Sequence, residues 1–249
     1  MEKTNWIKLM SSSEFAERKK TCDTVIIPVG ATEVYGPHMP MGSDIIVAQE
    51  IAERVADQVN AMIGPSLELG ESYSLSKYPG TMYFSVPTYL AIIKDIMDNL
   101  IRLGFKYFMF INGHAGNVPL IGQVVRPMER DLGVKVAQVD WWRFTHSAAA
   151  TACDTKGWMC HGHASECGTS VMLYLHPEYV HMEKAQKVTP KEGDDFGKYD
   201  DFVTYNTFNE TTDCGILGDA TIASAEKGAK VIELSVSRIV EYMRDQFVC

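Results

Sequence analysis

Short apolar runs alternate along this chain with longer segments in which apolar residues recur every three or four positions. Two runs, residues 25–29 and 107–111, are apolar almost throughout, which is typical of strands covered on both faces. Shorter runs at residues 61–65 and 135–139 are expected to be strands as well. Strands that alternate with helices in this way predict a mostly parallel central sheet with helices on both faces, an α/β fold.

The predicted helices lie between these strands. Ser11 and Glu14 are typical of a helix N-terminus, and the short helix that they begin is expected to end near Lys20. The apolar periodicity predicts four longer helices: residues 45–60, 89–103, 119–132 and 165–175. Near the C-terminus, the pattern predicts a strand at residues 230–234 that leads directly into a final helix.

The chain shows no internal repeat and no linker that would divide it. All of residues 1–249 are therefore expected to form one domain. Residues 184–215 are polar and rich in Gly, Asp, Thr and Asn. We expect this segment to be an excursion or lid outside the core.

Charge and hydropathy restrict the partners. The formal net charge is −9, and the only basic cluster is at residues 18–20, so nucleic acid is not an expected partner. No apolar run is long enough to cross a membrane, and the first residues lack the apolar region of a signal peptide. We therefore expect a cytoplasmic protein whose partner is a small-molecule substrate.

The six cysteines are scattered and form no Cys-x-x-Cys pair. Without a signal peptide, this distribution predicts reduced thiols rather than a disulfide framework. Cys160 and Cys167 flank a histidine-rich segment, which leaves a thiolate ligand or nucleophile open. No second cysteine at ligand spacing supports either role, so the sequence does not favour them.

The first polar motif with candidate chemistry follows the strand at residues 25–29. It contains Glu33, His38 and Asp44, whose oxygen and nitrogen atoms are ligands that Zn²⁺, Mn²⁺ and Fe²⁺ accept. Ligands of open parallel sheets bind where loops leave the carboxyl ends of strands. In the alternative structural interpretation, Asp44 caps the next helix and Glu33 is solvated.

Two further motifs are candidates for the same edge of the sheet. His114 stands between glycines in residues 112–117, directly after the strand at 107–111. A third motif, residues 161–170, contains His163 and Glu166 at the start of a predicted helix. A carboxylate in a first helical turn also has a purely structural explanation, because the helix dipole favours it there.

Together the three motifs resemble the creatininase (creatinine amidohydrolase) family. The matching loops are Gly-Ala-Thr-Glu-x-x-Gly-Pro-His-x-Pro-x-Gly-x-Asp (residues 30–44), Asn-Gly-His-x-Gly-Asn (112–117) and His-Ala-x-Glu-x-x-Thr-Ser (163–170). The resemblance extends to residues 78–81 and 218–228. It implies a three-layer α/β fold, a homo-oligomer (usually a hexamer) and one or two divalent metal ions. Family members hydrolyse C–N bonds of small cyclic or formyl amides, and some relatives open a keto-inositol ring.

The resemblance also implies roles for individual residues. Glu33, Asp44 and His114 match ligands of the first metal ion, and Glu166 matches a carboxylate that some members supply from this segment. The expected ion is Zn²⁺ or Mn²⁺, with Fe²⁺ as a further option. His163 matches the acid or base toward the substrate. Substrate-binding residues are expected at four further positions: Trp142, His38, Ser74 and Tyr78.

Tyr35 is the main departure from the family pattern, because the usual residue is a histidine of the second metal site. A phenol titrates near 10 and is a poor divalent ligand at neutral pH. Creatininase itself also has a glutamate where this chain has Gly116. One metal site is therefore expected rather than two, and Tyr35 is expected to donate a hydrogen bond to a developing oxyanion.

The sequence thus favours a metal-dependent hydrolase that cleaves a C–N bond of a small polar cyclic or amide substrate. Two alternatives remain open. The same site could open the ring of a keto-cyclitol at a C–C bond, or the chain could be a non-catalytic relative that binds a metal or ligand.

Overall fold

The structure, a computed structural model, describes residues 4–144, 152–194 and 205–247. Its centre is a four-stranded sheet of order β2-β1-β3-β4 in which every pair of neighbours is parallel. The strands are β1 (Thr24–Val29), β2 (Met62–Ile63), β3 (Tyr107–Asn112) and β4 (Lys135–Asp140). The predicted α/β fold with a parallel central sheet is confirmed.

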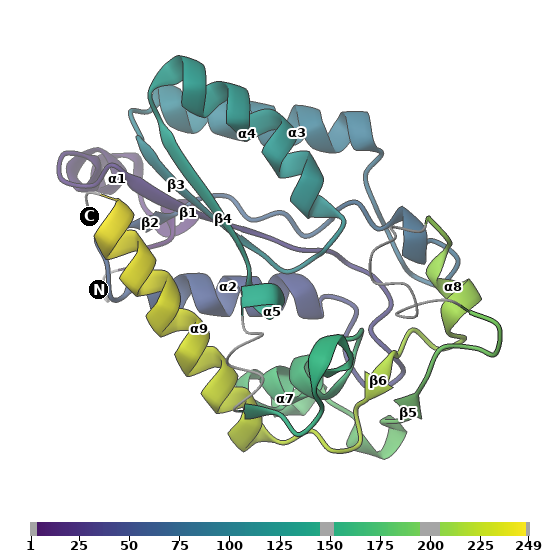
Figure 1. The fold of residues 1–249 in the computed structure, drawn as a ribbon. Coiled ribbons are helices and arrows are strands. Elements are labelled where there is room, and N and C mark those ends of the chain that lie inside the picture. The colour runs from purple at the N-terminus through teal and green to yellow at the C-terminus, as the bar shows by residue number, and fades with distance from the viewer. Residues whose placement is uncertain (1–3, 145–151, 195–204, 248–249) are drawn as a thin grey trace.

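Helices cover both faces of this sheet (Figure 1). On one face, α3 (Val86–Arg102) and α4 (Asn117–Leu132) pack on each other, and the short α1 (Ser12–Lys19) contributes Phe15 to the same apolar cluster. On the other face lie α2 (Ser43–Ala56), α7 (Glu166–Leu175) and α9 (Ala225–Gln246).

The side chains of β1 alternate between these two layers. Val25 and Ile27 point to the cluster beneath α3 and α4, whereas Ile26 belongs to the cluster beneath α2 and α9. All six residues of β1 are buried, because helices cover the strand on both sides. This burial explains why the sequence of the strand is continuously apolar and does not alternate between apolar and polar residues.

The remaining elements are short. They are α5 (Trp141–Phe144), α8 (Phe208–Thr211), the antiparallel pair β5 (Lys187–Val188) and β6 (Gly218–Asp219), and five 3-10 turns: Ile7–Leu9, Tyr73–Leu75, Gly157–Cys160, Pro177–Tyr179 and Met182–Lys184. The polar segment 184–215 therefore contains β5 and α8, while its residues 195–204 lie outside the described part of the chain. Within the described residues, no helix combines the length and apolarity needed to cross a bilayer.

The predicted strand at residues 230–234 is wrong, because α9 is continuous from Ala225 to Gln246. Val231 and Ile232 have high strand propensity, but both are buried in the layer that α9 forms with α7 and α2. Packing of this kind overrides the weak local preference of β-branched residues. Gly228 allows the close approach, since a Cβ there would lie 1.9 Å from the Ser170 carbonyl oxygen.

Candidate metal centre and active site

Three predicted ligands meet at the carboxyl edge of the sheet. Glu33 lies in the loop after β1, Asp44 in the first turn of α2 and His114 directly after β3. His114 Nδ1 is 3.1 Å from Glu33 Oε2 and 3.4 Å from Asp44 Oδ2. One candidate ligand atom from each residue lies within 4.8 Å of the other two, and all three side chains are buried.

Two glycines at strand ends make this convergence possible. A Cβ on Gly113 would lie 2.2 Å from the Asp44 carbonyl oxygen, and one on Gly30 would lie 2.5 Å from the Ile45 nitrogen. Larger residues at these positions would therefore push the start of α2 away from β1 and β3. The backbone contact places Asp44 between the two strand ends.

Asn112 fixes the loop that carries His114. Its side-chain amide donates to the His114 carbonyl oxygen at 2.7 Å and to Asp140 Oδ1 at 3.0 Å. Its side-chain oxygen accepts a hydrogen bond from the His114 backbone amide at 3.2 Å. The Asn-Gly-His sequence therefore combines a close backbone approach with a side chain that locks the turn.

His114 has the orientation of a metal ligand. Its Nε2 lies 2.6 Å from the Glu71 carbonyl oxygen, which can only accept, so Nε2 carries a proton and donates. Nδ1 faces the two carboxylates and is the atom available to a cation. A hydrogen bond on the second ring nitrogen is the usual arrangement for histidine ligands, because it fixes the ring and its tautomer.

The charges of this group fit a divalent ion. Burial raises the pKa of Asp44 to about 6, and the neighbouring Glu33 charge adds to the effect. Burial would lower the pKa of His114, but the two carboxylates outweigh it and raise the pKa well above its ordinary value. Without an ion, a proton on His114 thus compensates part of the negative charge of the two carboxylates. A divalent cation would replace that proton and give both buried carboxylates a partner.

His163 approaches the same group from the segment that precedes α7. The backbones of His163 and Leu217 exchange two hydrogen bonds, and His163 Nδ1 donates to the Gly215 carbonyl oxygen at 2.6 Å. Its Nε2 is left 3.3 Å from Glu33 Oε1. Burial would lower the pKa of His163, but Glu33 raises it above its ordinary value. A proton donor or acceptor is therefore directed at the candidate metal site.

Tyr35 lies beside His163 at the candidate metal site. Its ring packs on His163 with 4.8 Å between centroids. Burial, together with the charges of Asp44 and Glu33, raises the pKa of the phenol well above its ordinary value. Tyr35 is therefore protonated at neutral pH and can donate a hydrogen bond.

These side chains line a small cavity of about 170 Å³. Trp142 and Ser74, which the sequence analysis assigns to substrate binding, belong to its wall, as does the buried Trp141. A volume of this size accommodates a small molecule.

Among the described residues, His38 and Tyr78 are not in the cavity wall. The His38 ring is buried, its Nε2 lies 2.9 Å from Thr169 Oγ1, and burial lowers its pKa to about 4. The Tyr78 hydroxyl donates to the Thr212 carbonyl oxygen at 2.5 Å. Both side chains connect segments around the site, and their contact with substrate stays a prediction.

Glu166 is directed away from the candidate ligands. Its carboxylate is 2.7 Å from Lys227 Nζ and accepts hydrogen bonds from the backbone amides of Asp154 and Thr155, both at 2.8 Å. The distant Lys227, on α9, could not be inferred from the local motif. The role of Glu166 as a metal ligand or base stays a prediction, and we leave Glu166 out of the proposed metal site because its carboxylate is paired with Lys227.

The structure also brings together a second group of potential ligands, of which the sequence analysis considered only Cys160 and Cys167 and did not favour them. Cys153, Cys160 and Cys167 are buried, with their sulfur atoms within 4.8 Å of one another. Their separations of seven residues match no familiar ligand motif, and only the folded path of the segment shows that they meet.

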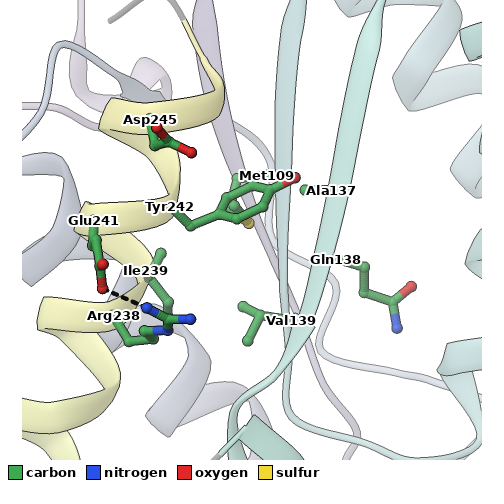
Figure 2. Close-up of a pocket in the computed structure, with 9 residues that line it drawn as sticks. All are labelled: Met109, Ala137, Gln138, Val139, Arg238, Ile239, Glu241, Tyr242 and Asp245. Carbon is green, nitrogen blue, oxygen red and sulfur yellow. Dashed lines mark hydrogen bonds and ion pairs between the residues drawn. The ribbon is translucent and has the colours of Figure 1, made fainter.

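A larger cavity of about 600 Å³ lies between β4 and α9 (Figure 2). It faces the middle of β4 and not its carboxyl end. Arg238 and Glu241 of its wall pair with each other at 2.6 Å, and Tyr242 extends toward the sheet. We therefore place the candidate active site in the smaller cavity, where the acids, imidazoles and phenol converge.

Known proteins resemble this chain over nearly its whole length. The sequence is 29% identical to a creatinine amidohydrolase of Pseudomonas putida, covering 99% of each chain. It is 26% identical to a 3-dehydro-scyllo-inosose hydrolase of Thermotoga maritima, covering 96% of this chain and 83% of the relative. It is 23% identical to a mycofactocin precursor peptide peptidase of Mycobacterium ulcerans, covering 94% of this chain and 91% of the relative.

Solved structures give the same result. A creatininase described as the Mn form and a creatininase mutant described as the Zn-Zn type each have a TM-score of 0.86 and 26% identity to this chain. Each match covers 99% of this chain and 100% of the solved one. The family model for creatininase, described as creatinine amidohydrolase, matches residues 8–243. With the parallel sheet and the motifs at its edge, this match shows that the chain belongs to the creatininase family of hydrolases.

Proposed function

We propose that the protein is a metal-dependent hydrolase that cleaves a C–N bond of a small cyclic or amide substrate. The observation that carries the proposal is the buried group of Glu33, Asp44 and His114, in which Nδ1 of the imidazole faces both carboxylates. Solved relatives with Mn and with Zn support a divalent ion of this kind. When bound, such an ion polarises a substrate carbonyl and lowers the pKa of a water molecule.

The residues of the chain supply the proton transfers. His163 Nε2 is positioned to take a proton from the attacking water and return it to the leaving nitrogen, while its Nδ1 stays hydrogen-bonded to Gly215. The protonated phenol of Tyr35 donates to the oxygen on which negative charge develops. Trp141 and Trp142 narrow the cavity and exclude bulk water.

Gly116 supports a single ion at this site. A Cβ on Gly116 would lie 2.1 Å from the Glu71 carbonyl oxygen and 2.7 Å from His114 Nε2. The Glu71 carbonyl is the acceptor that orients His114, so this backbone leaves no room for a glutamate at position 116. Together with Tyr35 in place of the family histidine, this argues for one ion between Glu33, Asp44 and His114.

Ring opening of a keto-cyclitol remains the second candidate, because the inosose hydrolase of Thermotoga maritima covers nearly the same length of chain. The purified protein, supplied with Mn²⁺ or Zn²⁺, should be assayed against lactams, formamides, short peptides and keto-cyclitols. We expect turnover of a cyclic or simple amide that is lost in His163→Gln. Turnover of keto-cyclitols alone would assign the second function. Bound metal without turnover of any substrate class would identify a non-catalytic relative.

We also propose, from the family resemblance alone, that the protein forms a homo-oligomer. Light scattering should give a mass several times that of one chain. A monomeric mass at assay concentrations would contradict this.

A further inference from the structure

Three cysteine side chains from residues 153–167, which lead into the first turn of α7, meet in the interior. Cys153 lies in the loop before the 3-10 turn Gly157–Cys160, Cys160 ends that turn, and Cys167 lies in the first turn of α7. Their exposed fractions are 4%, 1% and 1%, and their sulfur atoms all lie within 4.8 Å of one another. None of the three is in a disulfide.

We propose that Cys153, Cys160 and Cys167 bind a zinc ion at a site separate from the carboxylate–imidazole group. Sulfur ligands favour Zn²⁺ over the harder ions, such as Mn²⁺ and Mg²⁺, that carboxylates accept. The two groups share no residue, so the chain offers one site with oxygen and nitrogen ligands and another with sulfur ligands. The fourth ligand of a tetrahedral ion would be water or a nearby side chain.

The spacing of the thiols is compatible with such an ion. A zinc–sulfur bond of about 2.3 Å and a tetrahedral angle place two sulfur ligands about 3.8 Å apart. The observed upper limit of 4.8 Å exceeds this by about 1 Å, which side-chain rotation can close.

A helix terminus and a paired carboxylate lie beside the thiols. Cys167 lies in the first turn of α7, a ten-residue helix whose N-terminal dipole stabilises negative charge. The adjacent Glu166 carboxylate is paired with Lys227 Nζ at 2.7 Å, so the cation offsets part of its repulsion toward the thiolates. The Glu166–Lys227 pair thereby acquires a role that the hydrolytic site does not give it.

An ion at this position would hold one wall of the catalytic cavity. Cys160 and Cys167 enclose His161, Gly162 and His163, all of which line that cavity together with Cys167 itself. Joining the two cysteines through one ion would close a short loop around His163. The zinc site would therefore fix the position of His163 through the loop that carries it, without itself contacting the substrate.

Cobalt distinguishes the two sites because only thiolate ligands give an intense charge-transfer band in the near ultraviolet. The full-length protein should be stripped with a chelator under reducing conditions and then loaded with Co²⁺. We expect the band in the wild type and in Asp44→Asn, which changes only the carboxylate group. Cys160→Ser should lose the band and one equivalent of bound metal, while Cys22→Ser, a buried cysteine outside the group, should retain both.

The wild-type spectrum tests whether thiolates bind the metal ion even if Cys160→Ser does not fold. Folded, reduced wild-type protein that binds Co²⁺ without a thiolate band would overturn the proposal. Mass spectrometry of protein purified without reductant provides an independent result. A disulfide between two of the three cysteines, with no zinc bound, would also overturn it and would instead identify a redox pair.

Discussion

The two groups of potential ligands differ in how the fold assembles them. Glu33, Asp44 and His114 come from three elements that are fixed by the parallel sheet, namely the ends of β1 and β3 and the start of α2. The three cysteines come from one segment of fifteen residues with little regular structure. The first group is therefore positioned by strand pairing and the second by the path of a loop.

This difference has a mechanical consequence. The carboxylate–imidazole group lies where glycines press the strand ends against α2, so its geometry is set before any ion binds. The loop of the cysteine group is held by side-chain contacts, namely the burial of its three cysteines in the core, the hydrogen bonds of Glu166 and its pair with Lys227. We expect substitutions in the first group to change activity, and those around the second to change stability.

The largest effect should come from Asp44→Asn. This change keeps the size of the side chain but removes a charge that the ion requires, so kcat should fall by at least about 10³-fold, above the range for one lost oxyanion donor. Asp57→Asn, at the exposed C-terminal end of the same helix, is the matched control and should keep full activity. Activity of Asp44→Asn within about tenfold of the wild type would refute the assignment.

Tyr35 should rank second. Tyr35→Phe removes the phenol that faces Asp44 and His163, and kcat should fall by about 10²–10³-fold with unchanged metal content. Tyr35→His tests the opposite view, in which the tyrosine merely replaced a ligand. Under that view the histidine variant gains an equivalent of metal and retains activity. A fully active Phe variant would make Tyr35 a packing residue.

Lys227→Met should act on stability. It leaves the buried Glu166 carboxylate with two backbone donors but without its cation. The free energy of unfolding should fall by about 2–3 kcal/mol, slightly below the range for breaking a buried ion pair. Urea unfolding measures this, with Lys230→Met, an exposed position on the same helix, as the control. Equal stability of both variants would show that the pair contributes little.

The smallest effect concerns His38. Burial lowers its pKa to about 4, below that of the unfolded chain, so the unfolded chain binds more protons between these values. The stability that the buried, neutral His38 ring contributes to the free energy of unfolding is therefore complete above about pH 6.5. It is lost as the pH falls toward about 4. Between about pH 7.5 and about pH 5, the wild type should lose about 2 kcal/mol more unfolding free energy than His38→Gln. Parallel pH profiles in urea unfolding would show that His38 titrates normally.

The same contrast explains what the sequence could predict. Apolar runs predicted the strands of the central sheet. The polar loops after these strands predicted that Glu33, Asp44 and His114 lie at one edge, because parallel strands end together. The pairing of Glu166 with Lys227 could not be predicted, because Lys227 lies 61 residues away on another helix. Cys160 and Cys167 were considered as ligands but not favoured, and Cys153 was not connected with them, because no rule of spacing describes an irregular loop. The strand predicted at residues 230–234 failed because packing against α7 outweighed local propensity.

The central claim is that hydrolysis depends on an ion held by Glu33, Asp44 and His114. It is tested most directly by stripping Cys160→Ser of metal, so that the sulfur site cannot compete, and adding back Zn²⁺ or Mn²⁺ in steps while activity and bound metal are measured together. Activity should be absent from the stripped protein, rise in proportion to bound metal and level off near one equivalent. If the cysteine variant does not fold, the wild type should show the same rise, with a total of about two equivalents of Zn²⁺ bound. Stripped protein that hydrolyses its substrate at the full rate would contradict the account.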